Sequence, residues 1–151
     1  VNSRTSEITL ASLLPSNEVV ASPLYKSFSS DKGRSWTQPE PFTANGVKPR
    51  LFLLENGVLV LVSGRPGIQL RFSLDGTGRE WTNPIDMLPF LKQDGSYDVW
   101  ETTCGYAGVE VDGKDSFYLV YSDFTTENGK ADKRKSIIFR KVTVEKDNKF
   151  I

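Results

Sequence analysis

Few residue types in this chain could carry out chemistry. Its 151 residues include no histidine and one cysteine, Cys104. The lack of histidine excludes Ser-His-Asp triads, histidine general bases and the common zinc ligand sets. A single cysteine can form neither an intramolecular disulfide nor a CxxC metal site, and without an evident basic partner we expect Cys104 to be a small buried residue. Any catalysis must therefore use carboxylates, tyrosine, lysine, arginine or that cysteine, and we expect no metal and no cofactor.

The overall composition narrows the choice of partners. Lys and Arg together number 19, as do Asp and Glu, so the formal net charge is zero. This balance gives no reason to expect nucleic-acid binding. No apolar run approaches the roughly 18–20 residues of a membrane span, and no signal peptide is visible at Val1. We therefore expect neither a nucleic-acid partner nor a membrane span.

One turn signature occurs twice, at a spacing of 44 to 45 residues. Residues 29–36 read S-x-D-x-G-x-x-W, and residues 73–81 repeat this order with one residue inserted before the second glycine. Ser and Asp can hydrogen-bond nearby backbone amides, and glycine supplies a positive φ. The returning tryptophan can cover an apolar layer. The spacing matches a four-stranded propeller blade of roughly 40–45 residues, and we expect these turns to be structural rather than catalytic.

The strand pattern agrees with this period and predicts an all-β fold. Residues 46–90 contain four expected strands, at 50–54, 58–63, 68–73 and a weak one ending near residue 87. The flanks supply further expected strands at 19–28, 35–42, 104–111, 117–122 and 137–144, with a loop at 123–135 and a possible strand within 1–14. We interpret the chain as one partial β-propeller domain, 1–151, of about two and a half antiparallel blades. Residues 1–45 form an incomplete blade, 46–90 a complete one and 91–151 another incomplete one.

A partial ring leaves apolar blade faces unpaired. Either further blades lie elsewhere in a longer protein, or a second copy of the chain closes the ring. We favour the first interpretation, in which the sequence is a fragment.

Several runs of residues resemble the sialidase (neuraminidase) superfamily of Asp-box, or BNR-repeat, propellers. They are Pro23–Tyr25, Asp31–Trp36, Val47–Leu51, Gly64–Gly67, Leu70–Ser73, Gly105–Tyr106 and Ser136–Val144. The resemblance covers nearly the whole chain and matches the C-terminal half of the family's catalytic propeller. It implies a six-bladed propeller in an extracellular or periplasmic protein that acts on terminal acidic sugars. Sialidases bind the sugar carboxylate with an arginine triad, use a Tyr nucleophile paired with a Glu, and employ an Asp acid/base that this chain lacks.

Strand direction places candidate residues on one rim. In an up-and-down blade, the start of the first strand and the end of the second share a rim, and the Asp turns lie on the opposite one. Arg50 and Arg65 therefore share a rim that Tyr106 joins from the next blade. The planar fork of arginine suits a carboxylate, so Arg50 and Arg65 are the candidate substrate-binding residues. The alternative for both is a solvated strand end or a structural salt bridge.

Tyr106 and Glu101 are the candidate catalytic residues. Tyr106 follows a glycine, as the sialidase nucleophile does, and a phenol needs a neighbouring carboxylate to take its proton. Glu101 is the nearest candidate in sequence, although Tyr106 could be a packing residue and Glu101 an exposed loop acid. Asp123 stands one position after the usual family Glu, and Ala107 replaces a common hydroxyl residue.

The resemblance thus predicts the C-terminal part of a sialidase-like glycoside hydrolase that is inactive as this fragment alone. The alternative is a non-catalytic propeller whose rim binds a glycan or a protein.

Overall fold

The computed structural model describes residues 7–12, 22–65, 67–88, 103–127 and 133–146. This part of the chain contains nine strands and no helix, and therefore no helix suited to crossing a membrane. The strands are β1 (Glu7–Ser12), β2 (Ser22–Ser29), β3 (Glu40–Leu53), β4 (Leu59–Gly64), β5 (Ile68–Ser73), β6 (Ile85–Leu88), β7 (Ala107–Val111), β8 (Ser116–Glu127) and β9 (Lys133–Thr143). The expected all-β fold is confirmed.

The strands form two antiparallel sheets. One sheet has six strands in the order β1-β2-β3-β4-β5-β6, and the other has three in the order β7-β8-β9. Strand β3 pairs with β2 through residues 40–46 and with β4 through residues 47–53. A break in the β3–β4 register between Val47 and Arg50, together with a φ of 47° at Lys48, marks the change of partner. The long strand β3 therefore belongs to two groups of strands that face different ways.

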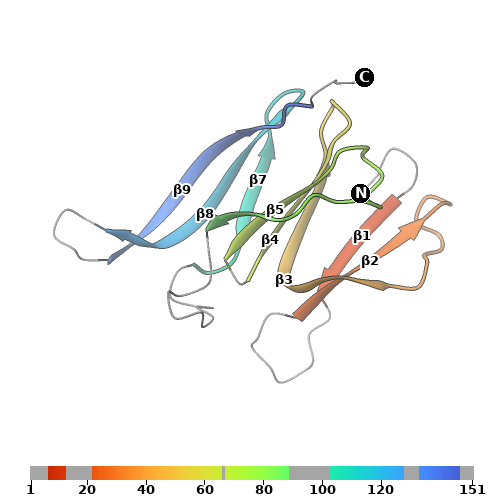
Figure 1. The fold of residues 1–151 in the computed structure, drawn as a ribbon, viewed down its shortest axis with the longest axis horizontal. Helices are drawn as coiled ribbons and strands as arrows, with labels where there is room; N and C mark the ends of the chain where they lie inside the picture. Colours follow the sequence, from red (N-terminus) through yellow and green to blue (C-terminus); the bar gives the residue numbers. More distant parts are fainter. Residues whose placement is uncertain (1–6, 13–21, 66, 89–102, 128–132, 147–151) are drawn as a thin grey trace.

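Three groups of strands pack face to face in a row (Figure 1). The first is β1, β2 and residues 40–46 of β3, the second is residues 47–53 of β3 with β4–β6, and the third is β7–β9. Phe28 of β2 packs with Leu59 of β4, on one face of the β3–β6 group. The opposite face carries the larger core, where Phe52 and Phe117 meet edge to face with ring centres 5.0 Å apart. Strand β4 is buried along its whole length because residues of β2 pack on one of its faces and residues of β8 on the other. The fold is thus a row of strand groups held by two apolar layers.

Both Ser-Asp turns cap the end of a strand, after β2 and after β5. In the first turn, the Ser29 hydroxyl accepts the Gly33 amide at 2.7 Å. The Asp31 carboxylate accepts the amides of Arg34 and Ser35 at 3.0 and 2.8 Å. The expected pairing of these side chains with backbone amides is confirmed.

The second turn repeats this arrangement with a longer loop. The Ser73 hydroxyl accepts the Gly78 amide at 3.0 Å and donates to Asp75 at 2.8 Å. Asp75 in turn accepts the Thr77 amide at 3.0 Å. The inserted residue therefore leaves the serine-to-glycine bond intact.

A threonine after each tryptophan completes the repeat and was not part of the sequence signature. The Phe28 amide donates to the Thr37 hydroxyl at 3.0 Å, and the Thr37 amide donates back to the Phe28 carbonyl at 2.8 Å. Thr82 and Phe72 form the same two bonds at 3.1 and 2.9 Å. The residue after the tryptophan thus closes each turn onto the strand that entered it.

The two tryptophans have different surroundings. Each indole donates to the carbonyl of its turn glycine, Trp36 to Gly33 at 3.1 Å and Trp81 to Gly78 at 2.8 Å. Trp81 packs on the Phe28–Leu59 layer, with its ring centre 5.4 Å from that of Phe42. Trp36 stays 42% exposed. The expectation that the tryptophan covers an apolar layer is confirmed for Trp81 alone.

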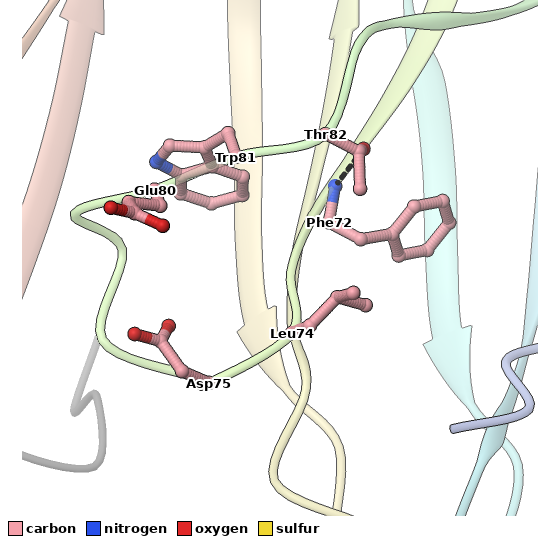
Figure 2. A pocket seen from close by; sticks show the side chains of 6 residues that line it. All are labelled: Phe72, Leu74, Asp75, Glu80, Trp81 and Thr82. Atoms are coloured by element: carbon pink, nitrogen blue, oxygen red, sulfur yellow. Dashed lines mark hydrogen bonds between the residues drawn. The ribbon is translucent and has the colours of Figure 1, made fainter. Parts of the chain in front are cut away.

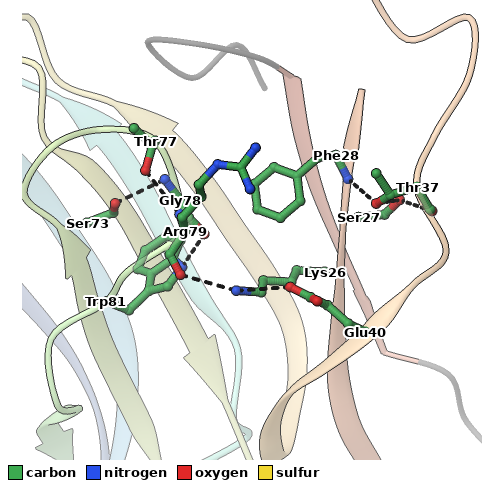
Figure 3. Close-up of polar contacts among 10 residues, drawn as sticks. All are labelled: Lys26, Ser27, Phe28, Thr37, Glu40, Ser73, Thr77, Gly78, Arg79 and Trp81. Atoms are coloured by element: carbon green, nitrogen blue, oxygen red, sulfur yellow. Dashed lines mark hydrogen bonds and ion pairs between the residues drawn. The ribbon is translucent and has the colours of Figure 1, made fainter. Parts of the chain in front are cut away.

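The second turn is also joined to β2 (Figure 3). Lys26 donates to the Arg79 carbonyl at 3.2 Å and forms an ion pair with Glu40 at 3.2 Å. The Arg79 guanidinium lies 5.1 Å from the centre of the Phe28 ring. This turn therefore links two neighbouring groups of strands.

Some expected boundaries were wrong. The predicted loop at 123–135 is largely strand, because β8 extends to Glu127 and β9 begins at Lys133. The possible strand within residues 1–14 is present as β1. The described residues form two open sheets, and no closed ring is present among them.

Replacing Ser73 by alanine tests the structural role of the turn. The Ser73 side chain is fully buried and bonds to two partners. Its loss leaves the Gly78 amide without its acceptor, so we expect the free energy of unfolding to fall by about 1–3 kcal/mol. The exposed Ser30 is the matched control, and Ser30→Ala should stay within about 0.5 kcal/mol of the parent. Equal losses for the two variants in urea unfolding would contradict the assignment.

A second test concerns the charge of Asp31. The hydroxyl and amide of Ser35, with smaller contributions from Ser29 and Arg34, lower the pKa of Asp31 to about 2 from a usual 3.8. These bonds favour the ionised carboxylate, so its stabilising contribution is complete above pH 3.8 and is lost as the pH falls through about 2. NMR titration of the carboxyl carbon should show this midpoint, and Ser35→Ala should move it upward. A midpoint near 3.8 in the parent protein would refute the prediction.

Candidate functional site

Two cations flank an exposed tyrosine where the second and third groups of strands meet. The Lys48 ammonium lies 4.6 Å from the centre of the Tyr106 ring, and the Arg65 guanidinium carbon lies 4.8 Å from it. Tyr106 is 42% exposed and Lys48 is also exposed. Cation–π contacts of this kind contribute about 0.5–1 kcal/mol at exposed sites. The three side chains, called here the Lys48–Arg65–Tyr106 cluster, can be reached from solvent.

Each member of the cluster comes from a different place in the chain. Lys48 stands at the bend of β3, Arg65 directly after β4, and Tyr106 directly before β7. Lys48 and Arg65 both have a φ of 47°. This left-handed conformation is uncommon for residues with a Cβ and costs energy that the surroundings must supply. The Arg65 turn is held by a bond from its own amide to the Gly67 carbonyl at 3.1 Å.

Two glycines let these segments approach closely. A Cβ on Gly64 would lie 1.7 Å from the Gly105 carbonyl oxygen, and a Cβ on Gly105 would lie 2.3 Å from Arg65 Cγ. The φ of Gly105 is +72°, which a larger residue would adopt only with strain. The neighbours of these glycines in sequence are Arg65 and Tyr106. Backbone contact therefore places the two side chains next to each other.

Hydroxyl groups hold the segment that leads to Tyr106. Ser122 of β8 accepts the Cys104 amide at 3.1 Å and contacts the Thr103 hydroxyl at 3.1 Å. The Thr103 hydroxyl accepts the Gly105 amide at 3.1 Å. The Cys104 carbonyl accepts a bond from Arg65 Nε at 3.3 Å. Both Thr103 and Ser122 are buried, so hydrogen bonds to buried side chains hold this turn in place.

The sequence-based candidates divide into three groups. Arg65 and Tyr106 lie next to each other, with the guanidinium carbon 4.8 Å from the ring centre. Arg50 is exposed on β3, and the second cation over the ring is Lys48 instead. Glu101 lies outside the described residues. Asp123 accepts the amide and hydroxyl of Thr125 at 2.7 and 2.6 Å, within its own strand.

Lys48 is the cluster residue that sequence reasoning missed. It was recognised only as part of the Val47–Leu51 run, with no role assigned. The available signal was a basic residue directly before a proline, between two predicted strands. A residue before a proline ordinarily takes an extended conformation, so this signal does not predict the φ of 47° that Lys48 adopts.

The cluster has a positive character suited to an anion. Lysine offers a compact point charge and arginine a planar fork, and the tyrosine hydroxyl can donate or accept a hydrogen bond. Within the described residues, no group of three or more His, Cys, Asp or Glu side chains could hold a metal. The arrangement can therefore bind a carboxylate or similar group beside a phenol.

A separate cavity of about 280 Å³ lies at the second Asp turn (Figure 2). Its lining residues are Phe72, Leu74, Asp75, Glu80, Trp81 and Thr82. Asp75 is already bonded within the turn, and the Thr77 amide and its other turn partners lower the pKa of its carboxyl group. None of these residues belongs to the Lys48–Arg65–Tyr106 cluster. The cavity is a feature of the turn.

Comparison with known proteins gives one solved structure with a similar fold. It is a polysaccharide lyase of family PL25, an ulvan lyase bound to -[GlcA(1-4)Rha3S]-. The TM-score is 0.57 at 15% sequence identity, over 92% of this chain and 36% of that chain. No protein-family model and no curated protein matches the sequence. The likeness shows a shared fold over about a third of the length of the lyase, and the resemblance to sialidases stays an interpretation of the sequence.

Substituting Gly64 tests the backbone contact beneath the cluster. The new Cβ of Gly64→Ala would overlap the Gly105 carbonyl, so the two segments must separate. We expect a destabilisation of about 1–3 kcal/mol, typical of overpacking. The amide resonance of Tyr106 should shift as well. Gly108→Ala is the control, because its Cβ would lie 3.9 Å from the nearest side-chain atom, on Val120. Tolerance of both substitutions would show that the contact is not needed.

Proposed function

We propose that this chain is part of a carbohydrate-active β-propeller whose Lys48–Arg65–Tyr106 cluster recognises an acidic sugar. One observation carries the proposal: two cations lie 4.6 and 4.8 Å from the ring of an exposed phenol. An acidic sugar offers a carboxylate or sulfate to the cations and hydroxyl groups to the phenol. The sugar-acid chemistry expected from the sequence thus has matching side chains on the predicted rim.

The arrangement of strands supports a propeller. Successive groups stack face to face, and β3 continues from the last strand of one group into the first strand of the next. We assign the incomplete blade 1–45, the complete blade 46–90 and the incomplete blade 91–151 to these groups. The count of six blades rests on the resemblance to sialidases. The remaining blades would come from a longer chain or from a second copy.

Our first candidate reaction is sialidase-type hydrolysis. The Tyr106 oxygen would attack the anomeric carbon as the bond to the leaving sugar breaks, and the leaving oxygen would take its proton from an acid/base Asp elsewhere in the complete propeller. Water would later release the acidic sugar. Glu101 would take the phenolic proton, and Arg50 and Arg65 would bind the carboxylate together with Lys48. The missing acid/base Asp leads us to expect no turnover by this chain alone.

A second candidate reaction is eliminative cleavage of a polymer that contains uronic acid. The structurally similar protein is named a polysaccharide lyase, and cations next to the phenol suit such a reaction. A base removes the proton next to the carboxylate, the bond to the leaving oxygen breaks, and a C=C bond forms. Lys48 and Arg65 would neutralise the carboxylate, and Tyr106 would exchange a proton with the substrate.

A non-catalytic propeller that binds glycans or proteins at this rim is the third candidate. It uses the same three side chains without any bond cleavage. A glycan partner, which all three candidates allow, favours an extracellular or periplasmic protein. We propose that location for this reason.

Binding of defined oligosaccharides tests the proposal directly. Sialyllactose and a glucuronate disaccharide are titrated into labelled protein, with neutral lactose as the control ligand. We expect saturable NMR shifts at Lys48, Arg65 and Tyr106 with an acidic ligand only. Lys48→Gln should weaken binding by about two- to fivefold, the range for loss of one exposed ion pair. Lys114→Gln, an exposed lysine in the β7–β8 turn, is the matched control.

Turnover assays then separate the reactions. Release of free sialic acid from a fluorogenic sialoside, lost in Tyr106→Phe, identifies hydrolysis. Ultraviolet absorbance from an unsaturated uronate identifies elimination. Because hydrolysis is not expected of this chain alone, binding without either product leaves the non-catalytic candidate only when the complete propeller is assayed. Equal shifts with lactose and with acidic ligands, or unchanged affinity in Lys48→Gln, would overturn the acidic-sugar proposal.

A further inference from the structure

We propose that the buried hydroxyl pair of Thr103 and Ser122 is the positioning element that sets the geometry of Arg65 and Tyr106. Neither hydroxyl contacts the ring or the guanidinium. They act through the backbone of residues 103–105, whose amides donate hydrogen bonds to them. The consequence for ligand binding rests on the function proposed above, whereas the geometric claim stands independently of it.

The pair accepts hydrogen bonds from two backbone amides, the buried amide of Gly105 and the partly buried amide of Cys104. Thr103 is fully buried and Ser122 is 7% exposed. Their hydroxyls lie 3.1 Å apart, and they accept the amides of Gly105 and Cys104 respectively, each at 3.1 Å. Unpaired buried amides cost free energy comparable to a lost hydrogen bond. The conformation of the 103–105 turn therefore depends on both hydroxyls.

The 103–105 turn also orients the guanidinium of Arg65. With the amide of Cys104 held by Ser122, the Cys104 carbonyl is presented to Arg65 Nε at 3.3 Å. This bond fixes one edge of the planar group, and the fork then lies against the ring of Tyr106 at 4.8 Å. A fixed guanidinium loses less rotamer freedom when it binds an anion. The hydroxyls thus lower the entropic cost of recognition at the rim.

The β7–β8–β9 sheet supplies the anchor. Ser122 lies on β8 between Tyr121, which is buried in the main core, and Asp123, which is bonded to Thr125. The anchor is thus a core strand with hydrogen-bonded neighbours on both sides. The position of Ser122 is therefore set by the core and not by the rim.

Substitutions at Thr103 separate the hydroxyl from the shape of the side chain. Thr103→Val removes the hydroxyl at nearly constant volume, and Thr103→Ser keeps it. We expect Thr103→Val and Ser122→Ala to shift the Arg65 Nε–H resonance in a nitrogen–proton NMR spectrum, and Thr103→Ser to retain the parent position. The Arg71 Nε–H resonance is the internal reference. Ser116→Ala is the matched control, because Ser116 is a buried serine on the same strand that bonds to the Asp112 carbonyl.

Binding gives the second readout. Thr103→Val should weaken the affinity for the acidic disaccharide by about two- to fivefold, because a displaced Arg65 loses one exposed ion pair to the ligand. Thr103→Ser should restore it. If neither variant without the hydroxyl folds, hydrogen exchange of the parent protein decides the matter: the Cys104 and Gly105 amides must be protected.

The outcomes distinguish the two proposals. A shifted Arg65 resonance without ligand binding in the parent protein upholds the positioning role and overturns the function. Ligand binding in the parent, with an unmoved Arg65 resonance in Thr103→Val, overturns the positioning role. Exposed Cys104 and Gly105 amides overturn it as well. A shift in Ser116→Ala as large as in Thr103→Val would show a general loss of stability instead of positioning.

Discussion

The contact between Gly64 and the Gly105 carbonyl is the constraint on which the rest of the rim depends. There is no space for a Cβ at this point, since one on Gly64 would lie 1.7 Å from the oxygen. The main core brings the sheets together, with Phe52 against Phe117, and the glycines let the backbones touch at the edge of that core. Arg65 and Tyr106 follow directly in sequence. Their proximity is therefore a consequence of backbone packing and does not require a strong attraction between the side chains.

The two spaces between neighbouring groups of strands are closed differently. Between the first and second groups, Trp81 fills the layer and Arg79 and Lys26 tie its turn to β2. Between the second and third groups, a cavity of about 420 Å³ lies between β5–β6 and residues 140–145. No described turn of the third group brings a tryptophan to that place. The third group is instead joined to the second through the main core and through the contact between Gly64 and Gly105. That contact also brings Arg65 and Tyr106 together, so the packing of the two groups and the geometry of the cluster depend on the same glycines.

The sequence predicted more of the fold than of the site. Period, alternation and turn chemistry act locally, which is why the all-β class, the Ser-Asp turns and the run of strands from 50 to 73 could be predicted from residue types alone. The long extension of β8 and β9 could not, because the polar residues 123–127 and 133–135 resemble a solvated loop in sequence and only cross-strand pairing makes them strand. For the site, strand direction was enough to unite Arg65 with Tyr106. It could not choose between Arg50 and Lys48, because the choice depends on the bend at Lys48 and a positive φ there.

The bend at Lys48 also explains how two cations reach the same tyrosine ring. An ordinary β conformation at Lys48 would let β3 continue straight, and the strand would lack the turn by which it changes partner from β2 to β4. The same backbone state at Arg65 reverses the chain within four residues, between β4 and β5. Both residues are long cations rather than glycine, although glycine would adopt a φ of 47° at lower cost. The strain is maintained by the sheets on either side, and its effect is to bring two charged side chains to one phenol ring. A purely structural bend would not need a charge at either position, whereas recognition of an anion uses both.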